Sequence, residues 1–461
     1  LKYQSLEDAD YSQDIALFKA EVIAFVKDTQ AETYATIERT NADRTDKLIV
    51  DDLVKALNSL GALEVMRHGF KCFGRTIRIA YFQPAHGMTP ELEELFHKNR
   101  FRVIRQLHYS SVNRNSLDMV IVLNGIPIIT VELKNHFTGQ NVSHARRQYQ
   151  NDRDPRELIF TFKKRTLVHF AVDPDLAYMT TKLNGASTYF LPFNKGQNEG
   201  AGNPVAPPGK HRTHYLWEDV FSPVVLLDII GRFLHIEKKE RQIEVTRSGK
   251  SDLQKVTSES LIFPRYHQLD VVRKALADVR VHGVGRRYLI QHSAGSGKSN
   301  SIAWLSHQLI GVKRAGREVF DSVIVITDRR ILDDQIQKTI KQFMQVGATV
   351  GHATRSGDLR RFIEEGKKII VSTVQKFPFI LEEIGSEHRG RRFAIVIGSG
   401  WRSLARCVTS ALLFARRRPP QPQSRSPQRR ACRQMSCGST PQSDARRTDI
   451  STATMPSCSG S

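Results

Sequence analysis

Along the first hundred residues, Leu, Ile, Val and Phe recur every three or four positions, most regularly in Asp14–Thr29 and Lys47–Leu60. This interval places apolar side chains on one face of an α-helix, so the region is predicted to be mostly helical. From about Phe101 the pattern changes to short apolar runs separated by turn residues. Asp118–Leu123 and Ile126–Leu133 are two such runs, and the Asn-Gly dipeptide between them predicts a tight β-hairpin.

The chain after the hairpin divides into regions of different composition. Gly196–His214 is rich in Gly, Pro and Asn and predicts a surface loop. Glu237–Ser260 is charged, has few large apolar residues and predicts a linker between two domains. Beyond it, helical patterns alternate with short apolar runs at Tyr288–Gln291, Ser322–Thr327, Lys368–Thr373 and Phe393–Ile397. That alternation is typical of βαβ units around a parallel sheet.

The composition changes again after Ile397. Arg, Ser, Pro, Gln and Cys dominate residues 398–461, Lys and Glu are missing there, and no periodicity continues. Such a segment buries too little apolar surface to fold, so we predict that it is a disordered tail. Two origins fit this composition, namely a natural tail and translation out of frame.

The net charge of +22 favours a polyanionic partner, and nucleic acid is the default candidate. Residues 398–461 hold eleven Arg against two Asp, which leaves +13 on the preceding 397 residues, so the body of the chain is basic too. Four of the five Cys lie in the same tail, in no zinc-binding spacing, and the lone Cys72 fits a reducing compartment. With no apolar run of membrane-spanning length and no signal peptide, we expect a cytoplasmic protein without a membrane partner. Leu1 is not a start methionine, which leaves the natural N-terminus open.

Arg286–Leu309 reads as an apolar strand, a Gly-rich turn and a helix, the arrangement of a phosphate-binding loop. The predicted nucleotide-binding residues are Gly295, Ser296, Gly297, Lys298 and Ser299. The two glycines let backbone amides approach phosphate oxygens, and the helix N-terminus favours the anion. The lysine is predicted to reach the β- and γ-phosphates and the Ser299 hydroxyl to hold Mg²⁺. The strict pattern has Gly where this chain has His292.

Gln268 lies at the end of Pro264–Gln268, thirty residues before Lys298. Its amide can both donate to and accept from an adenine edge, which would select ATP. A solvated surface glutamine is the alternative.

The segments PRYHQ (Pro264–Gln268), GSGKS, VIVITDRRILDDQI (Val323–Ile336) and IIVSTVQKF (Ile369–Phe377) together resemble superfamily-2 helicase motors. More closely, they resemble the restriction subunit of type I restriction–modification enzymes. The resemblance implies ATP as a cofactor and an adenine contact for the glutamine. It also implies DNA-side or coupling roles for Thr327, Asp328, Arg329, Thr373 and Gln375, each of which alone also fits a strand end or a turn.

Asp118, Glu132 and Lys134 form a second candidate site on the predicted hairpin. Glu132 and Lys134 are two residues apart and point to the same face of a strand, while Asp118 begins the opposing strand. Two carboxylates there would hold Mg²⁺, and the ammonium would orient a water molecule or stabilise developing charge. The alternative is a set of solvated surface charges. However, the strands are apolar on both faces, and ionised groups at the ends of buried strands are costly unless they bind something.

The same segment resembles the PD-(D/E)xK nuclease core of type I restriction subunits, in which Asp, Glu and Lys of this arrangement are catalytic. His144–Asp173 is similar to the continuation of that domain. Relatives carry a Gln and a Tyr on the following helix, near the metal site. In this chain Gln148 and Tyr149 are adjacent instead of four apart, so the resemblance gives them supporting roles only.

These observations predict an α/β chain of four regions: a PD-(D/E)xK endonuclease domain at 1–236, a linker at 237–262, an incomplete first RecA-like superfamily-2 motor domain at 263–397, and a disordered tail at 398–461. ATP hydrolysis needs an acidic element after a strand. Relatives have Asp-Glu-Ala-His there, whereas Gly398-Ser399-Gly400-Trp401 follows Phe393–Ile397 here. Because the motif is lost where the composition shifts, we expect a frameshifted, truncated chain with negligible ATP turnover. Recovery of the motif in another reading frame by DNA sequencing would support the frameshift.

The predicted function is that of a type I restriction subunit, in which ATP-dependent translocation is coupled to Mg²⁺-dependent double-strand DNA cleavage. Its expected partners are double-stranded DNA and the methylation and specificity subunits. Two alternatives stay open: a superfamily-2 motor without nuclease activity, and a non-catalytic DNA-binding remnant. A nucleotide-binding regulatory protein explains neither the hairpin nor the basic charge. The sequence does not give the DNA target.

Overall fold

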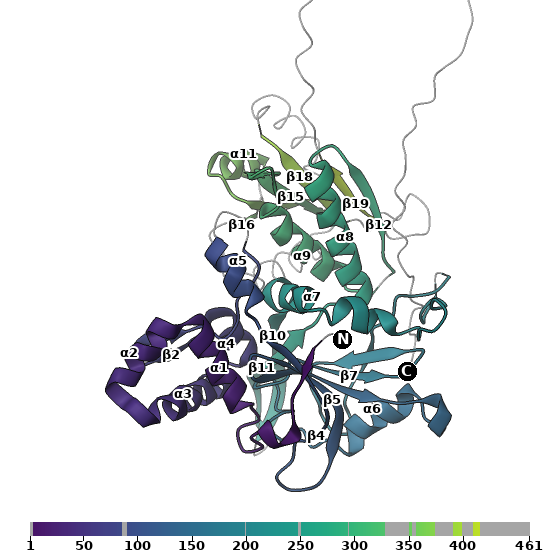
Figure 1. Ribbon diagram of the computed structural model, residues 1–461. Helices are drawn as coiled ribbons and strands as arrows, with labels where there is room; N and C mark the ends of the chain where they lie inside the picture. Colours follow the sequence, from purple (N-terminus) through teal and green to yellow (C-terminus); the bar gives the residue numbers. More distant parts are fainter. Residues whose placement is uncertain are drawn as a thin grey trace, which may run out of the picture.

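A computed structural model of the chain describes residues 3–84, 90–198, 200–247, 250–293, 295–327, 350–352, 356–373, 391–398 and 409–414. Two bodies follow one another in space, with the N-terminal helices and a large sheet at one end and a second, smaller sheet at the other (Figure 1).

The N-terminal part is helical, as predicted. It consists of η1 (Asp8–Asp10), α1 (Lys19–Thr29), α2 (Ala31–Asn41), η2 (Ala42–Arg44), α3 (Thr45–Ser59), α4 (Ala62–His68), the short hairpin β2 (Phe70–Cys72) and β3 (Arg75–Ile77), and α5 (Pro90–His97). The first long helix begins five residues later than its apolar pattern, at Lys19. The preceding segment closes on itself instead, because the Ser12 amide donates to the Leu17 carbonyl at 2.9 Å.

A seven-stranded sheet forms the centre of the first body, in the order β1-β4-β5-β6-β7-β8-β9. Its strands are β1 (Gln4–Ser5), β4 (Phe101–His108), β5 (Ser116–Leu123), β6 (Ile126–Leu133), β7 (Val168–Val172), β8 (Ala177–Thr180) and β9 (Leu191–Pro192). β5 and β6 are the predicted antiparallel hairpin. β6 and β7 run parallel, and the crossover between them contains η3 (His136–Thr138) and α6 (Val142–Asn151).

The hairpin turn uses Asn124 and Gly125, both with positive φ, at 49° and 87°. This conformation suits the twist of a two-residue hairpin and favours Asn-Gly. A Cβ added at Gly125 would lie 2.7 Å from the Phe18 carbonyl oxygen and 2.5 Å from the Val22 side chain. The turn therefore packs directly against the start of α1.

We expect Gly125→Ala to destabilise the protein by about 2–5 kcal/mol, the combined cost of a left-handed backbone and of overpacking. Urea unfolding of the variant and the parent measures this difference. Gly139→Ala is the matched control, because Gly139 also has positive φ but a Cβ there meets nothing within 4 Å. Equal losses in the two variants would contradict the packing argument.

The described residues of 196–213 form no helix and no extended strand, as expected for a loop, and helical structure begins at His214. The loop leads into three short helical segments, η4 (Leu216–Val220), α7 (Pro223–Asp228) and η5 (Ile229–Phe233). Tyr215, just before η4, is buried and donates its hydroxyl to the Phe193 carbonyl, which fixes the end of the loop to the sheet.

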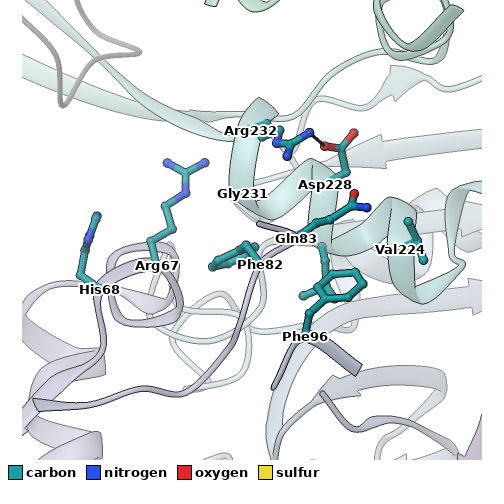
Figure 2. A pocket seen from close by; sticks show the side chains of 10 residues that line it. Arg67, His68, Phe82, Gln83, Phe96, Val224, Asp228, Gly231 and Arg232 are labelled. Carbon is teal, nitrogen blue, oxygen red and sulfur yellow. Dashed lines mark ion pairs between the residues drawn. The ribbon is translucent and has the colours of Figure 1, made fainter. Parts of the chain in front are cut away.

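A hollow of about 240 Å³ lies where these short helices meet α4 and α5 (Figure 2). Arg67 of α4 donates to the carbonyls of Ile230 and Leu234 and so caps the end of η5. Asp228 and Arg232 form an ion pair across one turn, with 3.3 Å between Oδ1 and Nη1. The hollow is thus a tightly bonded joint that holds the helical part against the segment entering the second body.

The charged region predicted as a linker between domains forms a long β-hairpin, a secondary structure that was not predicted for it. β10 (His235–Arg247) pairs antiparallel with β11 (Lys250–Ile262) over thirteen residues in each strand. The pairing is explained by backbone hydrogen bonds between strands, which need no apolar face. The hairpin is fixed to the first body because Lys163 forms an ion pair with Glu259 and the Thr181 hydroxyl donates to the Leu261 carbonyl at 2.8 Å.

The second body contains a six-stranded sheet in the order β12-β19-β18-β15-β17-β16, in which β16, β17, β15 and β18 are parallel. The strands are β12 (Arg287–Gln291), β15 (Ser322–Thr327), β16 (Val350–His352), β17 (Ile369–Thr373), β18 (Phe393–Gly398) and β19 (Thr409–Phe414). Around them lie α8 (Tyr266–His282), α9 (Lys298–Ile310), α11 (Ser356–Glu364) and the small hairpin β13 (Lys313–Arg314) and β14 (Arg317–Glu318). The predicted parallel sheet is confirmed.

The structure also extends past Ile397. β19 lies antiparallel between β12 and β18, inside the segment expected to be a disordered tail. The expectation was therefore wrong for Thr409–Phe414. The reason is local, since Ala-Leu-Leu-Phe is an apolar run within that segment and two strand edges were open to pair with it.

One buried apolar cluster continues from the first body into the second. Phe193 packs against Phe263 and Tyr266 with ring centroids 6.0 Å apart in each pair. Trp304 of α9 is fully buried and donates its indole N–H to the Phe233 carbonyl at 2.6 Å. The two bodies therefore share a core.

Candidate functional site

Asp118 of β5 and Glu132 of β6 lie side by side. The register pairs Met119 with Val131, which places the aspartate opposite the glutamate. Asp118 is partly exposed, and its Oδ2 accepts from the Leu133 amide at 2.8 Å. Glu132 is fully buried. The two carboxylates therefore meet at the edge of the sheet, as the hairpin pattern predicted.

Lys134 follows β6 and faces the same carboxylates. Its Nζ lies 3.6 Å from the Asp118 Oδ2, and its amide donates to the Val172 carbonyl of β7 at 2.9 Å. The backbone bond continues the sheet by one residue, which keeps the side chains of residues 132 and 134 on one face. The structure thus brings together all three predicted catalytic residues of the hairpin.

Arg153 holds the buried glutamate. Its Nε and Nη2 lie 2.8 and 2.7 Å from the Glu132 Oε1, and its Nη2 also donates to the Ser116 carbonyl at 2.7 Å. The guanidinium is 3% exposed and lies over the ring of Tyr109. One arginine therefore joins the two strands that carry the carboxylates.

Burial raises the pKa of Glu132 to about 8, against the opposing effect of the Arg153 guanidinium, and Asp118 raises it further. The Glu132 Oε2 is buried and has no hydrogen-bond partner. A buried carboxylate oxygen without a partner, beside a second carboxylate, is an acceptor position for a proton or a cation.

The two residues of α6 that were assigned supporting roles point in different directions. Gln148 is half-buried and lines the hollow that also contains Lys134. Tyr149 is fully buried, and its hydroxyl lies 2.8 Å from the Thr130 Oγ1, which in turn contacts the His169 Nδ1 at 2.8 Å. Tyr149 therefore anchors the helix to the sheet beneath the site and does not line the hollow.

The hollow itself has a volume of about 460 Å³ and is polar. It is lined by Lys134, Gln140, His144, Arg147, Gln148, Asn151 and Asp152. The cationic groups of Lys134 and Arg147 can bind phosphate oxygens there, next to the carboxylate pair.

The carboxylate pair suits Mg²⁺, which binds to proteins through one or two carboxylates and keeps several waters. Asp118 and Glu132 are the two carboxylates, and the unpaired Oε2 is the available oxygen. Among the described residues, no group of three or more His, Cys, Asp or Glu is arranged to hold a metal ion. A cation at this position would therefore depend on water or substrate oxygens for its remaining ligands.

The raised pKa of Glu132 makes folding stability pH-dependent. The folded state keeps a proton up to about pH 8, whereas the unfolded chain releases it near the ordinary value of 4.5. Stability from this group is thus fully present below pH 4.5 and lost as the pH rises to about 8.

We expect the free energy of unfolding, measured with urea between pH 5.5 and 8.5 in EDTA, to fall with pH relative to a Glu132→Gln/Arg153→Met double variant. The limiting slope for one proton is about 1.4 kcal/mol per pH unit. The double variant is the reference because it removes the titrating group together with its buried partner. A pH-independent difference would contradict a raised pKa.

The predicted phosphate-binding loop joins β12 to α9. Gly295 and Gly297 have φ of 73° and 79°, and α9 begins directly afterwards at Lys298, followed by Ser299. The Lys298 Nζ donates to the Ser293 carbonyl at 2.8 Å, and burial lowers the pKa of this lysine. Ser296 is buried and donates its hydroxyl to the same carbonyl at 2.8 Å. The five residues thus lie at a strand–turn–helix junction, where helix N–H groups favour an anion.

Gln268 braces this loop. It is buried, its amide nitrogen donates to the Ser296 and Gly297 carbonyls at 3.1 and 2.9 Å, and its Oε1 accepts from the Arg265 amide at 2.8 Å. Both ends of the amide that was predicted to contact adenine are therefore bonded to backbone. His267 accompanies it, with Nε2 3.1 Å from the Ser296 carbonyl. His292, the departure from the strict pattern, is buried with its ring centroid 4.9 Å from that of His267.

Two of the motor residues implied by the resemblance lie together. Thr327 and Thr373 are paired at the carboxyl ends of β15 and β17, and Gly398 of β18 is paired with Thr327 on the other side. This edge is the usual ligand side of a parallel sheet. Asp328, Arg329 and Gln375 lie outside the described residues.

Arg153 was not predicted as a site residue. It follows Glu132 by twenty-one positions, across a helix and a turn, and no spacing rule connects the two. Thr130 and His169 were missed for the same reason. The available signal was weak: a buried acid needs a cationic partner, and five Arg lie within residues 146–165.

Both regions are similar to families of known proteins. Residues 26–188 match the family described as the N terminus of type I restriction enzyme R protein, and residues 267–407 match the SWI2/SNF2 ATPase family. No helix within the described residues is long and apolar enough to span a membrane.

The relatives are consistent with this pair of domains. The type I restriction enzyme MjaVIIIP endonuclease subunit of Methanocaldococcus jannaschii is 24% identical over 249 residues, covering 53% of this chain and 21% of the relative. The MjaIXP endonuclease subunit of the same organism is 22% identical over 297 residues, covering 62% and 27%. The SauCOLORF180P endonuclease subunit of Staphylococcus aureus is 22% identical over 285 residues, covering 60% and 26%. The matches therefore span about a quarter of the length of these relatives.

Proposed function

Starting from its membership of the type I restriction enzyme R subunit family, we propose that the chain cleaves double-stranded DNA with Mg²⁺ at Asp118, Glu132 and Lys134. The observation that carries the proposal is the convergence of these side chains at one edge of the sheet, around a buried Glu132 oxygen without a partner. The basic hollow beside them gives the phosphate backbone a place to bind.

The residues of this candidate site have separate roles in the proposed chemistry. Asp118 and Glu132 hold Mg²⁺, which when bound polarises a phosphate and lowers the pKa of an attacking water. Lys134 orients the water or stabilises charge on the phosphate. Arg153 keeps Glu132 at the end of its strand, while Gln148 faces the substrate side of the hollow and Tyr149 supports α6 from below.

The direct test is incubation of the full chain with supercoiled plasmid DNA in Mg²⁺ and in EDTA. We expect nicked and linear products in Mg²⁺ only. Intact plasmid under both conditions, with DNA binding retained in a filter assay, would exclude the nuclease and leave the alternative of a DNA-binding protein.

For the second body we propose ATP binding at Gly295, Ser296, Gly297, Lys298 and Ser299, with Ser299 on Mg²⁺ and Gln268 holding the loop through the Ser296 and Gly297 carbonyls. Within the family's cycle this site would power translocation along DNA, in complex with methylation and specificity subunits in the cytoplasm. A second candidate function for this body is ATP binding without hydrolysis. It is favoured because Gly398 occupies the strand end where an ATPase needs its acidic residue.

We expect Lys298→Ala to weaken ATP binding about 10- to 100-fold, because it removes the charge paired with the β- and γ-phosphates. A fluorescent ATP analogue measures the affinity, and phosphate release measures turnover, expected near zero in both proteins. Lys313→Ala, on the small hairpin after α9, is the control. Substantial ATP hydrolysis that depends on Lys298 would contradict the expected lack of turnover.

A further inference from the structure

Phe137 is the most exposed large apolar side chain of the described residues, at 96%. It lies in η3, on the turn that joins Lys134 to α6. It follows the candidate catalytic lysine by three positions, so its backbone lies within about 10 Å of Lys134. This exposure leaves the phenylalanine ring accessible to a ligand of the candidate nuclease site.

The turn that presents Phe137 is braced. The Asn135 Oδ1 accepts from the Phe137 amide at 3.0 Å, and the Asn135 carbonyl accepts from the Thr138 hydroxyl at 2.8 Å. Gly139 closes the turn with φ of 69°, its amide donating to the His136 carbonyl at 2.9 Å. These bonds fix the backbone and hold the ring outward, so little ordering is needed when it meets a partner.

The turn is also tied to the catalytic body. The His136 Nε2 lies 3.6 Å from the Asp173 Oδ2, and the same oxygen accepts from the Val142 amide at the start of α6. Asp173 is buried at the end of β7. The position of Phe137 is therefore set by the same strand and helix that position Lys134 and Gln148.

The surroundings of the ring are polar and, on the side of the hollow, cationic. Asn135, His136, Thr138 and Gln140 are exposed around it, and Lys134, His144 and Arg147 line the adjoining hollow together with the acidic Asp152. A protein-binding patch needs several apolar side chains that together cover a few hundred Å². A single aromatic ring beside phosphate-binding groups matches a nucleobase instead.

From these observations we infer that Phe137 is a wedge, which inserts into the DNA base stack next to the phosphate that is cut. Apolar side chains inserted at a base step unstack it and bend the duplex, and aromatic rings stack on exposed bases. At a rise of about 3.4 Å per base pair, its distance from Lys134 places the step within about three base pairs of the cut. The inference rests on the proposed nuclease function.

The test uses the full chain and a duplex with 2-aminopurine at successive positions around a mapped cut, in Ca²⁺ so that DNA is bound without cleavage. We expect fluorescence to rise at one step on binding. Phe137→Ala should lose this rise, and its nicking rate in Mg²⁺ should fall about tenfold, while Phe137→Trp retains both. Phe73→Ala is the matched control, because Phe73 is 54% exposed on the turn between β2 and β3, within the helical part.

Each other outcome overturns the inference. Bound DNA without a fluorescence change, or a Phe137→Ala variant that behaves like the parent, excludes a wedge. Normal DNA results together with lost binding to the methylation and specificity subunits would assign the ring to a protein partner. The nuclease proposal fails independently, by unchanged nicking in Lys134→Ala, while the Ca²⁺ fluorescence still reports on Phe137.

Discussion

Replacing Lys134 by Ala should lower the rate of Mg²⁺-dependent DNA cleavage by about 10²- to 10³-fold, the usual effect of removing one group that stabilises transition-state charge. The lysine Nζ lies 3.6 Å from the Asp118 carboxylate and lines the hollow, so in the proposed function it acts on both the cation site and the phosphate. Asp118→Asn should have an effect at least as large. It keeps the shape of the side chain and removes the charge that a cation needs.

Both variants should remain folded, because Lys134 and Asp118 are partly exposed and neither is in the core. Circular dichroism and urea unfolding check this, and a plasmid nicking time course measures the rate. Lys55→Ala, a surface lysine of α3, is the control. DNA cleavage by the Lys134→Ala variant at the parental rate would contradict the proposed catalytic role of Lys134.

Replacing Arg153 by Met should destabilise the first body by about 1–3 kcal/mol at neutral pH, since the buried oxygens of Glu132 and Ser116 would lose their hydrogen-bond donor. The loss should grow as the pH rises above about 8, where Glu132 ionises beside the guanidinium in the parent, whereas in the variant its pKa is higher still because the cationic partner is missing. Below about pH 8 the acid is neutral in both folded proteins, and the loss should not depend on pH. Thermal and urea unfolding at about pH 6 and about pH 9.5 measure both effects.

The Glu132→Gln/Arg153→Met double variant provides the control. Exchanging both partners for neutral groups of similar volume is often close to neutral for stability. We therefore expect the double variant to be more stable than the single one at about pH 9.5. If the single variant is as stable as the parent at that pH, the pair does not position Glu132.

Much of the fold could be predicted because local patterns decide it. The Asn124-Gly125 turn, the apolar runs of β5 and β6 and the periodicity of α1 and α3 all act over a few residues. The hairpin of β10 and β11 could not be predicted in the same way. Its charged strands lack a regular alternation of apolar and polar residues. Their pairing becomes apparent only in the structure, where residues up to 27 positions apart in the sequence lie opposite one another.

The candidate site follows the same division. Asp118, Glu132 and Lys134 lie on one hairpin, so strand geometry alone brings them together. Arg153 reaches Glu132 only through the path of α6, and Gln268 contacts the phosphate-binding loop across 29 residues. Such contacts depend on tertiary packing, for which one sequence carries no spacing signal. The exposed ring of Phe137 was equally invisible, because an apolar residue in a turn is more often buried.

The apolar cluster that joins Phe193, Phe263 and Trp304 couples the folding and the evolution of the two bodies. A cut between residues 236 and 263 would separate aromatic faces that are now in contact and place them in water. We therefore expect that neither half folds on its own, and that unfolding of one carries the other with it as a single cooperative transition. The two bodies would thus have to diverge together, since a substitution in the shared core of one has to be accommodated by the other.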